Sequence, residues 1–302
     1  MRDTDFILKQ EQIISDSMLD DGELERILCE DVRYGDLTTA ALAIGDLPGT
    51  ISFSARSAMT VCCVEEAARM LVRAGCRCGA PQRRGSQVEP GAWLLEAEGS
   101  AAALHRVWKS AQTLIEYASG IATAAARIVA AAGAAGTAPA VVCSRKNFPG
   151  TRAVSALAIA AGGAAAHRLG LAETLLVFAE HRVFLQGDLA QHLARVKRQH
   201  PEKKLVVEVT EIDEGLAVAR AGADIIQLEK FSLEQTAAFV AAVRSLPRPP
   251  LVAAAGGINA SNAAAYAATG VDILVTSAPF FAAPAEVKVV IAARPTNSHR
   301  KD

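Results

Sequence analysis

Past residue 140, short apolar runs alternate with longer segments that have the composition of helices. The apolar runs are residues 141–143, 174–178, 205–209, 225–228, 251–255 and 273–276. The segments that suit helices are residues 189–199, 214–221, 233–243 and 260–268. Two parallel strands need a helix-length connection between them, so this alternation predicts parallel βα units.

Charged, polar or glycine residues follow each predicted strand. They are Ser144-Arg145-Lys146, Glu180-His181, Thr210-Glu211, Glu229-Lys230, Gly256-Gly257 and Ser277. In a parallel α/β barrel the carboxyl ends of the strands meet at one mouth, which holds the active site. An open doubly wound sheet gathers ligands at the same ends, but no G-x-G-x-x-G pattern follows any predicted strand. We therefore predict a barrel with a charged mouth.

Two of these strand ends have simpler alternatives. Arg145 and Lys146 are cations of the kind that bind carboxylate and phosphate groups. The alternative is that they only mark where a buried strand ends in solvent. Gly256 and Gly257 resemble the phosphate-binding turn of barrels, where paired glycines leave backbone N–H groups free to bind phosphate at the start of a helix. The alternative for this glycine pair is an ordinary βα turn.

The first part of the chain has the mixed pattern of a small α/β domain. From Leu104, apolar residues at steps of three and four predict a helix that ends at Ser119-Gly120, where an Ala-rich helix begins. The other expected elements are a helix or arm at residues 1–20, a helix starting at residues 20–23, a turn at 34–39, antiparallel strands within 49–61 and 87–97, and a helix at 65–73.

Charge and cysteine content exclude several classes of protein. The net charge of −1 provides no basic field, so neither a nucleic acid nor a membrane is expected as a partner. The most apolar segment, residues 121–140, contains Arg127 and suits a packed helix. The cysteines lack zinc-site spacing, and no apolar leader follows the start of the chain. We expect reduced, buried thiols in a cytoplasmic protein.

Ordered motifs along nearly the whole chain resemble one known family. They are Glu30-Asp31, Gly35-Asp36-Leu37-Thr38, Ser119-Gly120-Ile121-Ala122-Thr123, residues 145–152 (RKNFPGTR), Gly162-Gly163, residues 167–171 (HRLGL), Glu208-Val209, residues 223–226 (ADII) and Gly256-Gly257-Ile258. With these motifs the chain resembles the quinolinate phosphoribosyltransferase (nicotinate-nucleotide pyrophosphorylase) family. Within that family it is most similar to the ModD branch, which is associated with molybdenum transport.

The resemblance implies a fold, an assembly and a reaction. The fold is an incomplete parallel α/β (TIM-like) barrel of six or seven strands at residues 119–279, with a smaller N-terminal α/β domain at 1–118 against which the tail 280–302 packs. The assembly is a homodimer in which the N-terminal domain of one subunit covers the barrel mouth of the other. The reaction transfers phosphoribosyl from phosphoribosyl pyrophosphate to a nitrogen heterocycle, with Mg²⁺, and releases pyrophosphate.

The resemblance also implies roles for residues that match the family's motifs. Arginine suits carboxylates as a bidentate fork, and lysine suits phosphates as a point charge. The implied contacts are Arg145, His167 and Arg168 with the acidic group of the acceptor, Lys146 with phosphate, Glu208 and Glu229 with ribose hydroxyls or Mg²⁺, and Gly256 and Gly257 with the 5′-phosphate.

The mouth departs from the family's pattern at several positions. Lys109 stands where the family has an arginine that reaches across the dimer, and Phe178 stands where it has a lysine. Thr210, Ser277 and Phe281 replace a glutamate, a glycine and a histidine. A lost charge-assisted contact is worth roughly 1.5–3 kcal/mol, so the acceptor is expected to be less charged than quinolinate.

We therefore predict a phosphoribosyltransferase-like enzyme. Two alternatives remain from the sequence: an orthodox quinolinate phosphoribosyltransferase of NAD biosynthesis, and a non-catalytic protein that binds an anion or metabolite in molybdenum handling.

Overall fold

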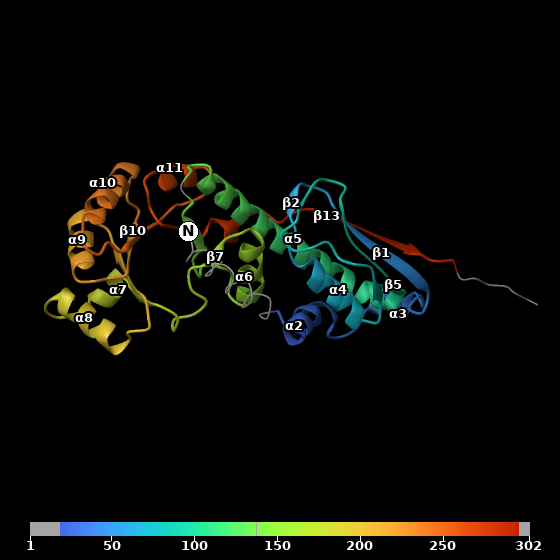
Figure 1. Cartoon of the computed structure of the whole chain (residues 1–302). Helices are drawn as coiled ribbons and strands as arrows, with labels where there is room; N and C mark the ends of the chain where they lie inside the picture. The colour runs from blue at the N-terminus through green and yellow to red at the C-terminus, as the bar shows by residue number, and fades with distance from the viewer. Residues whose placement is uncertain (1–18, 137, 296–302) are drawn as a thin grey trace, which may run out of the picture. The chain divides into compact units, whose positions relative to one another are not determined.

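The computed structural model describes residues 19–136 and 138–295, which form two compact units (Figure 1). Among the described residues, the barrel unit comprises Ala124–Arg152 and Gly163–Phe281. The N-terminal unit comprises the chain up to Thr123, Ala153–Gly162 and the chain from Ala282. The helix or arm predicted at residues 1–20 lies, up to residue 18, outside the described residues.

The barrel unit is built on a seven-stranded sheet in the order β7-β6-β12-β11-β10-β9-β8. All neighbouring strands are parallel, and within the described chain β7 and β8 remain the two open edges. The prediction of an incomplete parallel barrel is therefore confirmed. The strands are β6 (Ala140–Cys143), β7 (Ala165–Ala166), β8 (Leu175–Val177), β9 (Leu205–Val209), β10 (Ile225–Glu229), β11 (Leu251–Ala255) and β12 (Ile273–Thr276).

Every apolar run predicted as a strand in this unit forms one. Most positions of β9, β10 and β11 are buried, as expected for a parallel sheet covered on both faces. The sequence pattern does not predict β7, because two alanines beside paired glycines carry no strand signal.

Helices connect these strands; α9 contacts β9, β10 and α10, and α9 and α10 lie on the same side of β10 (Figure 1). A capping box starts α10, because Ser232 Oγ accepts from Gln235 N at 3.2 Å and Gln235 Oε1 accepts from Ser232 N at 2.9 Å. The helices are α7 (Ala179–Arg182), α8 (Leu189–Gln199), α9 (Ile212–Arg220), α10 (Leu233–Arg244) and α11 (Ala263–Ala268), followed after β12 by a 3₁₀ turn, η1 (Ala278–Phe281).

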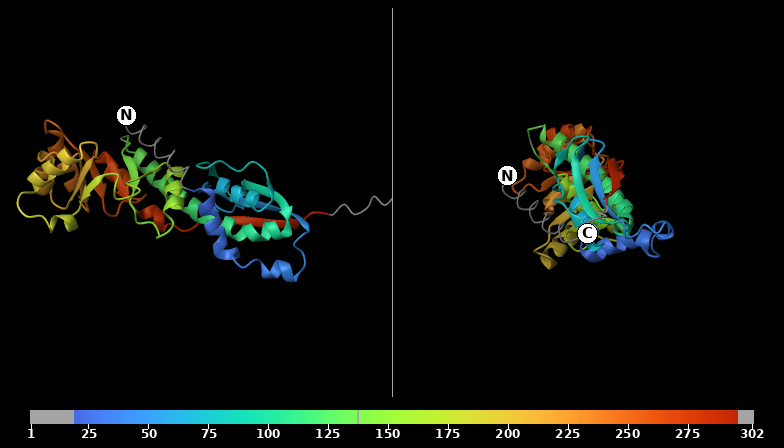
Figure 2. Two further views of the ribbon diagram at one scale, coloured as in Figure 1. Left: turned by 90° about the horizontal axis from the view of Figure 1, so that it is seen from below. Right: turned by 90° about the vertical axis from the view of Figure 1, so that its right-hand side faces the viewer.

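The N-terminal unit has a four-stranded antiparallel sheet in the order β13-β1-β5-β3. Burial alternates strictly along β1, which places Ile51, Phe53 and Ala55 in the core. The tail strand β13 lies along β1 (Figure 2). The elements are β1 (Pro48–Ala55), β2 (Met59–Thr60), β3 (Arg77–Cys78), β4 (Gln87–Val88), β5 (Trp93–Ser100) and β13 (Val287–Ala293), with helices α2 (Asp21–Val32), α3 (Leu37–Ala41), α4 (Val64–Arg73) and α6 (Arg152–Ala161).

One helix, α5, runs without a break from Ala101 to Gly133. The predicted helix end at Ser119-Gly120 is therefore wrong. A Cβ on Gly120 would lie 2.4 Å from the carbonyl oxygen of Ala283, so glycine is required there for close packing against another chain segment. The predicted domain boundary at 118/119 falls inside α5. The helix is long and apolar enough to span a membrane, but its apolar stripe packs in the core of the N-terminal unit, as in a globular domain.

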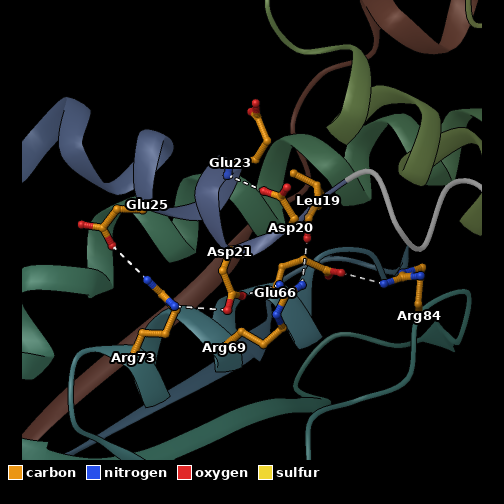
Figure 3. A network of polar contacts seen from close by, with 9 residues as sticks. All are labelled: Leu19, Asp20, Asp21, Glu23, Glu25, Glu66, Arg69, Arg73 and Arg84. Carbon is orange, nitrogen blue, oxygen red and sulfur yellow. Dashed lines mark hydrogen bonds and ion pairs between the residues drawn. The ribbon is translucent and has the colours of Figure 1, made fainter.

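Aspartates start two helices of the N-terminal unit. Asp20 caps α2 by accepting from Glu23 N at 2.9 Å (Figure 3), and Asp36 caps α3 by accepting from Thr39 N at 3.1 Å. The turn predicted at 34–39 is thus a helix start. Figure 3 also shows Asp21 bound by Arg69 and Arg73, an exposed network that contributes little to stability.

All the cysteines are free thiols. Cys62, Cys63, Cys76 and Cys143 are buried, as predicted from the sequence, whereas Cys29 and Cys78 are partly exposed. Burial raises the pKa of the Cys143 thiol to about 12, so this thiol is protonated and unreactive at neutral pH.

Candidate active site

A cleft of about 690 Å³ lies at the carboxyl ends of the barrel strands. Every strand of the sheet, or the loop that follows it, contributes to the wall, as predicted for a barrel mouth. The volume suits a small-molecule ligand. The lining residues are Ser144, Lys146, His167, Leu176, Phe178, Glu180, Glu208, Gln227, Glu229, Ala255, Gly256, Gly257, Ile258, Asn259, Val275, Thr276, Ser277 and Ala278.

The structure brings most of the predicted site residues together in this cleft. They are Lys146, His167, Phe178, Glu208, Glu229, Gly256, Gly257 and Ser277. Lys146 is the only cationic side chain among the described lining residues apart from the histidine. The cleft therefore contains one fixed positive charge and the carboxylates of Glu180, Glu208 and Glu229.

Three predicted site residues do not line the cleft. The guanidinium carbon of Arg168 lies 5.9 Å from the centroid of the Phe178 ring, a cation–π contact. Burial and, to a smaller extent, the charge of Arg145 lower the pKa of Arg168. Lys109 belongs to α5 of the N-terminal unit, where its Nζ donates to Gln112 Oε1 at 3.2 Å and lies 4.6 Å from the centroid of the Trp108 ring.

Glu208, Gln227 and Glu229 form an acidic strip on β9 and β10. Glu208 and Gln227 are register partners, and Gln227 Nε2 donates to Glu208 Oε2 at 2.6 Å. Glu229 is two residues further along β10 and so points to the same face of the sheet. Burial and the nearby Glu229 raise the pKa of Glu208. This strip therefore suits cations and hydrogen-bond donors.

His167 follows β7, and its backbone N–H donates to the carbonyl of Cys143 at 2.8 Å. Burial, with a smaller effect of the neighbouring Arg168, lowers the pKa of His167 to about 4. The imidazole is thus neutral at physiological pH. The imidazole can form a hydrogen bond in the cleft, but it lacks the positive charge expected of a residue that binds the acidic group of the acceptor.

This lowered pKa predicts a pH dependence of stability. Between the ordinary pKa of 6.5 and the folded value of about 4, the unfolded chain binds a proton that the folded chain does not, so stability falls as the pH falls through this range. The His167→Gln variant should lose this contribution, which is roughly 2–3 kcal/mol at pH 4 relative to pH 7. Urea unfolding of both proteins at several pH values measures it. Parallel pH profiles would contradict the prediction.

Phe178 directly follows β8 and stands at the N-cap position of α7 without a side-chain capping hydrogen bond. Its backbone N–H donates to His181 Nδ1 at 3.0 Å, and its ring stacks on the His181 imidazole with centroids 5.8 Å apart. Arg168 contacts the same ring. The ring of Phe178 thus contacts both His181 and Arg168 and contributes apolar surface to the lining of the cleft.

Gly256 and Gly257 follow β11 and both have positive φ, at 89° and 82°. A Cβ on Gly256 would lie 2.9 Å from the backbone nitrogen of Lys230, so the neighbouring strand end leaves no room for a side chain. The next helix, α11, begins only at Ala263. The glycine pair is therefore a tight loop separated from the helix start, which corrects the prediction that its N–H groups lie at a helix N-terminus.

Several residues of the cleft were not predicted as site residues from the sequence. Glu180 and Ser144 were predicted only to follow strands, and Gln227 only to belong to an apolar run. Gln227 did carry a signal, because a glutamine between Ile226 and Leu228 is a polar residue in an otherwise buried strand.

Comparison with known proteins agrees with this geometry. The family model described as quinolinate phosphoribosyl transferase, C-terminal domain, matches residues 121–287, and that of the N-terminal domain matches residues 36–119. The chain belongs to the quinolinate phosphoribosyl transferase family. The two matches together span both units of the structure.

Relatives within this family include proteins of two names. The chain is 50% identical over 248 residues to a "putative pyrophosphorylase ModD" of Rhodobacter capsulatus, covering 82% of this chain and 95% of the relative. It is 33% identical over 262 residues to a "nicotinate-nucleotide pyrophosphorylase [carboxylating]" of Mycobacterium leprae, covering 84% and 90%. The solved nicotinate-nucleotide pyrophosphorylase of Francisella tularensis has the same fold, with a TM-score of 0.80, 24% identity and coverage of 89% and 94%. The chain is thus a ModD-like member of the family.

Proposed function

We propose that this chain transfers the phosphoribosyl group of phosphoribosyl pyrophosphate to a ring nitrogen of a heterocyclic acceptor and releases pyrophosphate. The observation that carries the proposal is the composition of the cleft, in which Lys146, the acidic strip and the glycine pair line one cavity. These groups match the three parts of the donor: the leaving pyrophosphate, the ribose and the 5′-phosphate.

The chemistry requires positioned charge and no protein nucleophile. The bond between the anomeric carbon and the pyrophosphate oxygen breaks, and the ring nitrogen of the acceptor supplies the electron pair of the new bond. Positive charge develops on the sugar, where the carboxylates of Glu208 and Glu229 stabilise it. Lys146 stabilises the negative charge that accumulates on the departing pyrophosphate.

The acidic strip also fits the Mg²⁺ that the family implies. Mg²⁺ is held in such sites by one or two carboxylates together with substrate phosphates, so a dedicated protein cage is not required. Glu208 and Glu229 supply two carboxylates, and the described residues contain no larger cluster of His, Cys, Asp or Glu that could hold a metal. When bound, Mg²⁺ neutralises charge on the pyrophosphate.

The acceptor is proposed to be less anionic than quinolinate. Phe178 replaces a cation with a ring, and His167 is neutral at physiological pH. A carboxylate buried without a charged partner is unfavourable. The remaining arginines, Arg145 and Arg168, lie outside the cleft lining and suit one acidic group at most.

We further propose a cytoplasmic homodimer with a shared active site. Lys109 supports this arrangement, because it is exposed and makes no ion pair with a described residue. In the dimer implied by the family, this lysine would supply the partner's cleft with a second cation.

Calorimetry and a product assay test the function. The protein is expected to bind phosphoribosyl pyrophosphate in the presence of Mg²⁺ and to release pyrophosphate with at least one member of a panel of nitrogen heterocycles. Efficient turnover of quinolinate would favour the orthodox enzyme instead. Binding of the donor without pyrophosphate release from any heterocycle would favour a non-catalytic binding protein.

A further inference from the structure

The floor of the cleft contains a buried carbonyl oxygen that accepts no hydrogen bond. Gln227, in the middle of β10, is 4% exposed and lines the cleft. Its amide nitrogen donates to Glu208, but its Oε1 is buried and has no donor among the residues that the structure describes. Buried polar atoms are nearly always satisfied, so an unsatisfied one in a ligand-sized cleft indicates a contact that the ligand supplies.

The contact with Glu208 fixes the direction of this amide. Gln227 and Glu208 are neighbours in register on adjacent strands, and the Nε2 to Oε2 distance is 2.6 Å. A reversed amide would turn its carbonyl oxygen toward the carboxylate, which is repulsive while Glu208 is ionised. The side chain therefore keeps its donor on Glu208, and its acceptor oxygen is left without a partner among the described residues.

The depth of Gln227 identifies the part of the substrate that it meets. It precedes Glu229 by two residues on the same face of β10, which places it about 7 Å further from the mouth. The phosphate-binding groups proposed above, Lys146 and the glycine pair, lie in loops beyond the strand ends. This would place the donor phosphates at the mouth, the ribose nearest Glu229, and the flat acceptor at the floor beside Gln227 and Glu208.

The charges at the floor disfavour an acid group on the acceptor. A carboxylate there would face Gln227 Oε1 and the carboxylates of Glu208 and Glu229, and the described lining has only Lys146 as a fixed cation. An N–H group would instead satisfy Oε1. Leu176 and Val275, which also line the cleft, suit the apolar edge of a ring.

We propose that Gln227 selects an acceptor that presents an N–H donor, such as a carboxamide or amino substituent, and rejects one that presents a carboxylate at that position. This specificity role rests on the proposed function and deepens it by naming the class of acceptor. Nicotinamide and nicotinate are suitable probes, because they have the same shape and differ in one N–H₂ group against one carboxylate oxygen.

Calorimetry without Mg²⁺ and without the phosphoribosyl donor tests the proposal. The wild type is expected to bind nicotinamide at least tenfold more tightly than nicotinate. Gln227→Met, which keeps the side-chain length and removes the amide, should reduce this ratio to threefold or less. Gln199→Met, an exposed position at the end of α8, should leave the ratio unchanged.

Three outcomes would overturn the role of Gln227. They are nicotinate binding as tightly as nicotinamide, absence of binding by both, and an unchanged ratio in Gln227→Met. Thermal melts check that Gln227→Met folds. If it does not fold, the ratio of the affinities for nicotinamide and nicotinate is compared between the wild type and Gln227→Leu instead. Pyrophosphate release with the donor is scored separately. If the protein binds nicotinamide more tightly than nicotinate but releases no pyrophosphate, the role of Gln227 stands and the transfer reaction is rejected. If pyrophosphate is released but the two probes bind equally, the transfer reaction stands and the role of Gln227 is rejected.

Discussion

Lys146→Ala should abolish pyrophosphate release and weaken the binding of phosphoribosyl pyrophosphate by tenfold or more. Lys146 is the fixed cation of the described cleft lining, and it forms no ion pair with a described carboxylate that could hold it away from a ligand. Loss of one charge-assisted hydrogen bond to phosphate is worth roughly 1.5–3 kcal/mol, which corresponds to at least a tenfold change in the dissociation constant. The loss of turnover is larger, because the charge on the pyrophosphate increases as its bond breaks.

Calorimetry with Mg²⁺ and a pyrophosphate assay measure the two effects. Lys204→Ala is a matched control, because Lys204 is an exposed lysine of the same unit that does not line the cleft. It should bind and turn over like the wild type. Unchanged affinity of Lys146→Ala for the donor would remove this lysine from the site.

The sequence predicted the barrel well because its strands carry a local signal. Runs such as residues 205–209 and 251–255 are buried on both faces, so their apolar character is continuous and their ends are marked by polar residues. The strand ends then predicted which residues share the mouth, since parallel strands bring their carboxyl ends to one side.

What the sequence did not predict depends on contacts between distant segments. Gly120 looks like a helix end, but it is the point where residues 283–285 approach α5 too closely for any side chain. Gln227 looks like one polar residue in a buried strand, and its role became visible only with Glu208 beside it and its carbonyl unsatisfied. The neutral state of His167 likewise follows from burial, which no local motif encodes.

Gly256→Ala should be the most disruptive conservative change in the cleft. Alanine at a φ of 89° is strained, at a cost of about 1–2 kcal/mol. The added Cβ would also lie 2.6 Å from Lys230 Cγ and 2.9 Å from Lys230 N. The lysine side chain can rotate, but its backbone nitrogen is fixed by a 2.8 Å hydrogen bond to the carbonyl of Ala255. The ends of β10 and β11 must therefore separate.

Gly257→Ala separates the two effects, because Gly257 also has a positive φ, of 82°, but nothing lies within 4 Å of its added Cβ. It should lower the melting temperature by about 2–4 °C, as expected for ~1 kcal/mol. Gly256→Ala should lower it by about twice as much or more and weaken the binding of phosphoribosyl pyrophosphate by over tenfold, because the displaced loop carries the backbone N–H groups proposed to hold the 5′-phosphate. Equal melting temperatures for the two variants would show that β10 and β11 absorb the methyl group, and equal donor affinities would show that the loop does not hold the phosphate.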